Sequence, residues 1–149
     1  MNNLSRRSRL AIATVLDIAL HSRSHPVAAK ALAGRHHLPP RHFETLLQTL
    51  VKANILKGIR GPHGGYALAR ERRKISAGEI VRAIFSETNN DSGVQNESGL
   101  FVTLIDPVIH EATEAFLVHL DQITIDSLCQ KAAAEQALSI SLQDHDFTI

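Results

Sequence analysis

The 149-residue sequence lacks tryptophan and contains one cysteine, Cys129, and one tyrosine. A single cysteine excludes an internal disulfide and a cysteine-rich metal site. No apolar run approaches the roughly 20 residues that a membrane-spanning helix needs, so we expect no membrane partner. Because aromatic residues make up only 4% of the chain, the core must consist mainly of leucine, isoleucine, valine and alanine. The composition predicts one domain of ordinary size with an aliphatic core.

The sequence also lacks the motifs on which enzymes depend. It has no nucleophile motif, no cofactor fingerprint and no closely spaced pair of acidic residues near such a motif. We therefore expect no enzymatic activity and no cofactor. Cys129 is expected to be a buried, inert thiol, which makes an enzyme that uses it the weakest alternative. His110 and Glu114 lie four residues apart, but polar pairs on helix surfaces are common, and we expect no metal there.

The first residues, MNNLSRRSRLAIATVLDIALH, place arginines ahead of an apolar stretch, as a secretory signal peptide does. The apolar residues follow helical spacing, however, and Asp17 interrupts them. No A-x-A cleavage site follows. The sequence therefore favours a cytoplasmic protein.

Charge is distributed very unevenly along the chain. Residues 1–75 hold 14 Lys and Arg against 3 Asp and Glu, a formal charge of +11, whereas residues 76–149 hold 2 against 12, a charge of −10. A basic half joined to an acidic half is typical of a protein that binds a polyanion through one part. A solvated basic surface without a partner has the same totals, so charge alone leaves both interpretations open.

Helical spacing of apolar residues predicts three helices in the basic half, at about residues 4–21, 27–37 and 40–53. Asn54 is expected to end the third helix in a left-handed conformation. Two short segments, at about residues 55–60 and 66–69, predict a β-hairpin. Three helices followed by a hairpin is the order of a winged helix-turn-helix, whose third helix enters the major groove of DNA.

In the acidic half, the residues from Ser76 to Glu79 predict a capping box that opens a helix. The polar stretch 86–99 predicts a loop. Asp106-Pro107 predicts the start of a long helix, and Thr124 the cap of a last one, with residues 141–149 frayed.

These elements divide the chain into a winged domain (1–85), a polar loop (86–99) and C-terminal helices (100–149). The fold class is mainly α with a small β-hairpin. The long helix at 107–121 carries more apolar surface than a small winged domain can cover, which predicts a homodimer. The predicted interface consists of Val108, Ile109, Ala112, Ala115, Phe116 and Leu120.

The stretch IRGPHGGYALAR, at residues 59–70, allows three interpretations. A phosphate-binding loop is excluded, because the Gly-Lys-Ser/Thr ending is missing and a strand follows where a helix should. A plain turn remains open, although three glycines and a proline exceed the needs of a two-residue hairpin loop. We favour a tip that contacts DNA, because glycine lets the backbone approach closely and Arg60 suits the electronegative minor groove.

The same stretch carries a family resemblance. VKANILKGIRGPHGGYALARERRKISAGEIVRAI resembles the signature of the BadM/Rrf-two family of bacterial winged-helix transcription regulators. RSRLAIATVLDIALH is similar to the family's first helix, HLPPRHFETLLQTL to its recognition helix, and VIHEATEAFLVHLDQITIDSL to its long dimerisation helix. The resemblance covers nearly the whole chain, and its Gly-Pro-x-Gly-Gly-Tyr block is specific.

The resemblance implies which residues contact DNA. The base-reading positions of the recognition helix would be Arg41, His42, Glu44 and Thr45. Minor-groove contacts would come from Arg60 and the tip residues Gly61, Pro62, His63, Gly64 and Gly65. Phosphate would be contacted from the start of the first helix, by Ser5 and Arg6 or Arg7.

One departure from the family concerns iron. Many members hold an iron–sulfur cluster through three cysteines in the loop before the long helix, whereas residues 86–99 contain none. Thiolates are the usual ligands of such clusters, so we expect this chain to act without one.

The residues and the resemblance together predict a homodimeric transcription regulator, a repressor, that binds double-stranded DNA at a palindromic operator. An unidentified small molecule or protein would be its effector. The alternative is a winged-helix interaction module that has lost operator binding.

Overall fold

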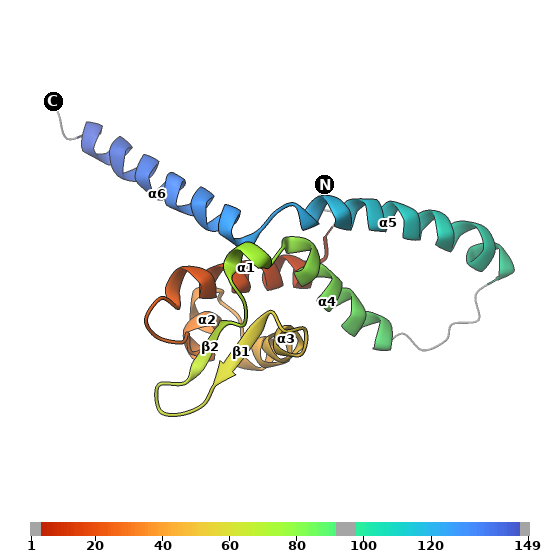
Figure 1. Cartoon of the computed structure of the whole chain (residues 1–149), viewed down its shortest axis with the longest axis horizontal. Helices are drawn as coiled ribbons and strands as arrows, with labels where there is room; N and C mark the ends of the chain where they lie inside the picture. The colour runs from red at the N-terminus through yellow and green to blue at the C-terminus, as the bar shows by residue number, and fades with distance from the viewer. Residues whose placement is uncertain (1–3, 92–97, 147–149) are drawn as a thin grey trace.

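The computed structural model describes residues 4–91 and 98–146. Figure 1 shows a body of short helices with a hairpin at its lower edge and two long helices that extend from its upper edge in opposite directions. The elements are α1 (Arg6–His21), α2 (Ala29–Arg35), α3 (Pro40–Lys52), β1 (Leu56–Ile59), β2 (Gly65–Leu68), the 3-10 turn η1 (Arg72–Lys74), α4 (Ala77–Asp91), the π-turn η2 (Phe101–Ile105), α5 (Asp106–Asp121) and α6 (Ile125–Asp146). No helix within the described residues is long and apolar enough to cross a membrane.

The first three helices lie where the sequence predicts them. Ser5 caps α1, since its hydroxyl accepts a hydrogen bond from the backbone N–H of Ser8 at 3.1 Å. The helices α2 and α3 pack against each other. The core contains apolar residues of all three helices, among them Val15, Ile18, Leu32, Phe43, Leu46, Leu47 and Leu50.

The predicted hairpin is confirmed. Asn54 follows α3 at φ 57°, the left-handed conformation expected of it. The strands β1 and β2 pair antiparallel, with Leu56 opposite Leu68 and Ile59 opposite Gly65. Three helices and this hairpin form the winged helix-turn-helix that the sequence predicts.

The capping box at the start of α4 is also confirmed. Ser76 N–H donates to Glu79 Oε2 at 3.0 Å, and Glu79 N–H donates to Ser76 Oγ at 3.1 Å. The predicted loop at 86–99 is partly wrong, because α4 continues to Asp91. The predicted domain boundary at residue 85 therefore falls inside a helix, while residues 92–97 of that loop lie outside the described residues.

The long helix α5 begins at Asp106, as predicted, but the helical turns that precede it from Gly99 are not predicted. Proline in a helix loses one hydrogen bond and collides with the carbonyl four residues back. Here the preceding turn is wide: Asp106 N–H donates to Phe101 O, five residues earlier. A π-turn of this kind makes room for Pro107 without ending the helix.

The last helix is firmly attached at its start. Thr124 caps α6, accepting a hydrogen bond from Ser127 N–H at 3.1 Å, as predicted. Ile125 N–H donates to Ile75 O at 2.9 Å, which joins the α5–α6 turn to the residues before α4. Ile125 and Cys129 belong to the core of the winged domain. The tail predicted to fray at 141–149 is helical as far as Asp146, beyond which no residue is described.

Candidate nucleic-acid interface

Helix α3 has one buried apolar face and one exposed polar face. Phe43, Leu46 and Leu47 are fully buried. Four predicted base-reading residues, Arg41, His42, Glu44 and Thr45, are exposed. The structure therefore presents all four on one polar surface. Arginine, histidine, glutamate and threonine side chains can all hydrogen-bond to base edges.

The tip of the wing needs its glycines for internal reasons. Gly61 has φ 120°, a conformation that other residues rarely adopt. A Cβ on Gly64 would overlap the carbonyl oxygen of Ile59, and one on Gly65 would overlap that of Val27. The sequence-based argument that this turn has more glycines than it needs is thus wrong. Backbone conformation explains Gly61, and close packing explains Gly64 and Gly65, whether or not the tip meets DNA.

Sequence analysis missed the attachment that fixes the direction of the wing. Val27, ahead of α2, forms a β-bridge with Tyr66 of β2, with both backbone hydrogen bonds at 2.8–2.9 Å. The wing is therefore tied to the segment between α1 and α2. Arg60, Pro62 and His63 remain exposed at its free end.

The two arginines proposed to contact phosphate differ in their surroundings. Arg6 is exposed and has no ion pair with any described residue. Arg7 donates from Nε and Nη2 to Glu87 Oε2, at 3.1 and 2.7 Å. The other carboxylate oxygen of Glu87 accepts from Thr49 Oγ1 at 2.9 Å. Glu87 thus links α1, α3 and α4, a role that the sequence concealed because residue 87 was assigned to a loop.

A buried carboxylate holds α2 against α1. Asp17, 9% exposed, accepts hydrogen bonds from Arg35 Nε and Nη2 at 2.9 and 2.7 Å. The ring of His36 lies 3.0 Å from Asp17 and that of His21 2.9 Å. Burial alone would raise the pKa of Asp17, but the hydrogen bonds and charge of Arg35, with His21 and His36, lower it overall. His36 is therefore part of this cluster.

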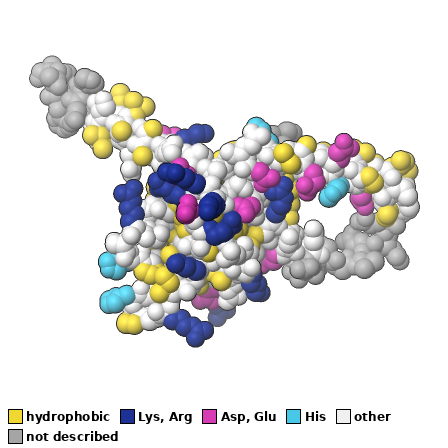
Figure 2. Space-filling model, in the orientation of Figure 1, with side chains coloured by type: hydrophobic (Ala, Val, Ile, Leu, Met, Phe, Trp, Pro, Cys, Tyr) yellow, Lys and Arg dark blue, Asp and Glu magenta, His cyan; other side chains and the backbone are white. Residues whose placement is uncertain are grey.

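Folding brings the acidic and basic halves into contact. Carboxylates of the second half pair with arginines of the first: Glu79 with Arg70, Glu87 with Arg7, and Asp126 with Arg72 and Arg73. Figure 2 shows Lys and Arg side chains spread over the winged body, and Asp and Glu along α5. Among the described residues, nine cations of the basic half have no ion pair: Arg6, Arg9, Arg23, Lys30, Arg41, Lys52, Lys57, Arg60 and Lys74.

The apolar surface predicted for a dimer is present and larger than predicted. Val108 and Ile109 are 64% and 59% exposed. Ala112 and Ala115 are exposed as well, and Phe116 and Leu120 are half-buried. Sequence analysis missed the preceding turns, where Leu100, Phe101, Val102, Leu104 and Ile105 are 45–61% exposed. Leu117, 2% exposed, is the residue of α5 that packs inward.

The sequence of this chain matches a known family of transcriptional regulators. A family model described as "Iron-dependent Transcriptional regulator", Rrf2, matches residues 4–131. The chain is 32% identical over 140 residues to the HTH-type transcriptional regulator slr0846 of Synechocystis sp., covering 90% of this chain and 92% of that one. It is 37% identical to Protein rrf2 of Nitratidesulfovibrio vulgaris over 81 residues, which are 54% of each chain.

Solved structures agree with the sequence matches. IscR from T. potens superposes with a TM-score of 0.68 at 27% identity, over 88% of both chains. CymR, the global cysteine regulator of B. subtilis, superposes with a TM-score of 0.63 at 25% identity, over 88% of this chain and 98% of that one. These neighbours are transcriptional regulators and not enzymes.

An iron–sulfur cluster does not fit the donor set of this chain. Cys129 is the only cysteine in the sequence, and its side chain is packed in the core, 4% exposed. Within the described ranges, no three His, Cys, Asp or Glu side chains converge as metal ligands would. His110 and Glu114 are exposed on α5, and Glu114 approaches Arg82. This chain therefore lacks the set of thiolates that would hold an iron–sulfur cluster.

Proposed function

We propose, since this chain belongs to the Rrf2 family of DNA-binding helix-turn-helix transcriptional regulators, that it acts as a homodimeric repressor on a palindromic operator. The observation that carries this proposal is the exposed polar face of α3 between a basic helix start and a basic wing. Each subunit would insert α3 into a major groove and the tip of the wing into the adjoining minor groove.

The proposed contacts fall into two classes. Arg41, His42, Glu44 and Thr45 would read base edges, whereas Arg6 at the start of α1 would bind phosphate. Phosphate contacts provide affinity that depends on salt and carries little sequence information. Specificity would therefore depend on α3 and on Arg60 at the wing.

A dimer is proposed because η2 and the start of α5 expose many apolar side chains. Monomeric proteins rarely expose a large apolar patch. A two-fold axis through α5 would present two copies of α3 to two half-sites about one helical turn apart. A regulator of this kind would bind its operator in the cytoplasm.

Arg60 provides a direct test of the proposed interface. We expect Arg60→Ala to weaken binding to an operator by ~1–3 kcal/mol, the cost typical of losing one arginine contact to DNA. Arg60→Lys is the matched variant, because it keeps the charge and loses the planar guanidinium. Binding should be intermediate in this variant.

Fluorescence anisotropy with labelled operator and scrambled DNA, each over a range of salt concentrations, measures the effect. Unchanged operator affinity in Arg60→Ala would remove the wing from the interface. Equal affinity of the wild type for operator and scrambled DNA would favour an interaction module that has lost operator binding.

A further inference from the structure

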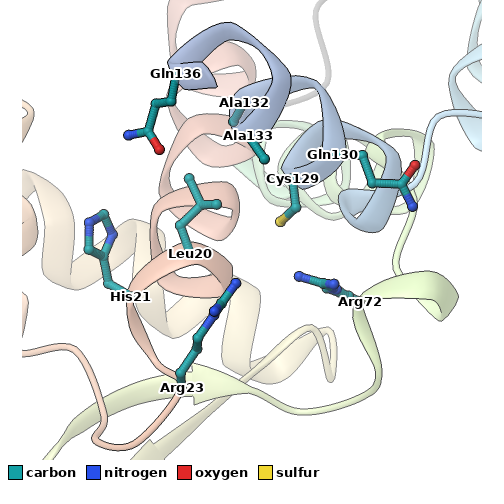
Figure 3. A pocket seen from close by; sticks show the side chains of 9 residues that line it. All are labelled: Leu20, His21, Arg23, Arg72, Cys129, Gln130, Ala132, Ala133 and Gln136. Carbon is teal, nitrogen blue, oxygen red and sulfur yellow. The ribbon is translucent and has the colours of Figure 1, made fainter. Parts of the chain in front are cut away.

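A hollow of about 320 Å³ lies between the end of α1, η1 and the first turns of α6. None of the residues proposed to contact DNA lines it. Figure 3 shows its wall: Leu20 and Ala133 are apolar, and Arg23, Arg72 and Gln130 are polar. The thiol of Cys129 points into the same space. The hollow thus combines a short apolar surface with two cations.

The two arginines give the hollow an unbalanced charge. Their guanidinium groups point into the same space (Figure 3), and no carboxylate lines it. Arg72 is partly balanced, since its Nε lies 2.6 Å from Asp126 Oδ1 in an ion pair. Arg23 has no ion pair or hydrogen bond with any described residue. Like charges held close together repel, and an anion between them would remove that repulsion.

Two polar side chains of the hollow, Arg72 and Gln130, are oriented by contacts with Asp126. Asp126 is only 9% exposed, and besides pairing with Arg72 it accepts a hydrogen bond from Gln130 Nε2 at 2.9 Å. One buried carboxylate therefore orients two side chains of the wall. The Nη atoms of Arg72 and the amide oxygen of Gln130 are not used in these contacts. A site oriented in advance loses less free energy on binding.

We propose that this hollow binds a small organic dianion, a dicarboxylate or a phosphate ester, between the guanidinium groups of Arg23 and Arg72. Arginine suits this task because its planar fork pairs with either oxyanion in bidentate geometry. The short carbon skeleton of the ligand lies against Leu20 and Ala133. Ligand pockets usually measure about 300–1,000 Å³, so a hollow at the lower end of that range accepts only a few carbon atoms.

The position of the hollow gives the ligand a means of regulation, which rests on the proposed function. Its walls join α1 and η1 of the winged domain to α6, whose first turn is connected to the end of α5. A dianion bound there shifts α6 toward one orientation and thereby changes the spacing of the two α3 helices in a dimer. Ligand binding itself does not depend on this consequence.

Two small dianions test the site. Full-length protein is titrated with succinate or with glycerol 3-phosphate at constant ionic strength, with potassium chloride as the reference. Binding is measured by isothermal titration calorimetry, and thermal unfolding is recorded in parallel. We expect one of the two probes to bind and to raise the unfolding temperature where chloride does not, and the responding probe identifies the class of dianion.

Two variants locate the binding. Arg23→Gln should raise the apparent dissociation constant about tenfold, as expected for one lost charge-assisted hydrogen bond. Lys30→Gln removes the same charge from an exposed position outside the hollow and should bind like the wild type. An equal effect of chloride, no effect of either probe, or unchanged affinity in Arg23→Gln would overturn the proposal. If a probe binds but operator affinity is unchanged, the site stands and only its regulatory role fails.

Discussion

Arg7 of α1 donates two hydrogen bonds to one carboxylate oxygen of Glu87 in α4, from Nε at 3.1 Å and from Nη2 at 2.7 Å. The guanidinium is thereby paired inside the protein, while its neighbour Arg6 is exposed without a carboxylate partner among the described residues. Two adjacent arginines at the start of one helix thus differ in whether their guanidinium group is free to bind a DNA phosphate.

Arg6→Ala and Arg7→Ala are therefore expected to have different effects. Arg6→Ala should reduce the slope of log K against log salt by about one and weaken all DNA sequences alike, because one phosphate contact is lost. Arg7→Ala should leave the slope nearly unchanged and reduce the free energy of unfolding by ~1 kcal/mol, as loss of a half-buried hydrogen-bonded pair does. DNA titrations at several salt concentrations and urea unfolding measure the two quantities. Equal slopes for the two variants would show that the pairing with Glu87 does not hold Arg7 away from phosphate.

Gly65 and Gly34 provide a matched pair of glycines. A Cβ on Gly65 would overlap the carbonyl of Val27, whereas one on Gly34 in α2 meets no atom within 4 Å. We expect Gly65→Ala to destabilise the protein or displace the wing. Gly34→Ala should stabilise it by ~0.5–1 kcal/mol, the usual gain of alanine over glycine within a helix. Thermal unfolding distinguishes them, and a Gly65→Ala protein as stable as the wild type, with unchanged DNA affinity, would contradict the packing described for the hairpin.

Asp17 predicts a loss of stability in acid. Its pKa is lowered because the hydrogen bonds and charge of Arg35, together with His21 and His36, outweigh the effect of burial. The ionised carboxylate therefore contributes stability that is present above the ordinary pKa of 3.8 and is lost as the pH falls through the lower pKa of the folded state. Asp17→Asn should reduce the free energy of unfolding at pH 7 by ~1–3 kcal/mol. This difference should shrink as the pH falls below about 3.8 toward the folded-state pKa, and a difference that is constant over the acid range would show that ionisation is not its cause.

The dimer is best tested at Ile109, because its side chain is 59% exposed and a change there spares the core. Ile109→Asp should yield monomers in light scattering at micromolar concentration, with unchanged helix content, and should abolish operator binding. His119→Asp places the same charge on an exposed position of α5 outside the predicted apolar set and serves as the control. A monomeric wild type would refute the dimer, and so would a dimeric Ile109→Asp.

Most of the winged domain could be predicted from the sequence because its signals are local. The spacing of Phe43, Leu46 and Leu50 defines a buried helix face, and the Ser76–Glu79 box is a contact within one turn. Asn54 adopts the left-handed conformation expected of its position after a helix. Local patterns of this kind specify an element without knowledge of its neighbours.

The errors concern contacts between distant segments. Glu87 was assigned to a loop because its surroundings are polar, yet the carboxylate is occupied by Arg7, 80 residues away in sequence, and by Thr49. Asp106-Pro107 is typical of a helix start and α5 does begin there, but this pattern does not reveal the π-turn that precedes it. Likewise, the glycines of the wing suggest a DNA contact when only the neighbouring sequence is considered. The carbonyl of Val27, which Gly65 approaches, lies far from them in the sequence.

The central claim is that α3 reads a two-fold symmetric DNA sequence, and selection of bound sequences from a random DNA pool tests it most directly. The wild type should enrich two inverted half-sites about one helical turn apart. Glu44→Ala should lose preference at one position in each half-site, because a carboxylate on this surface is repelled by phosphate unless it accepts a hydrogen bond from a base such as cytosine. Enrichment of no motif by the wild type, with binding that depends only on salt, would contradict the account.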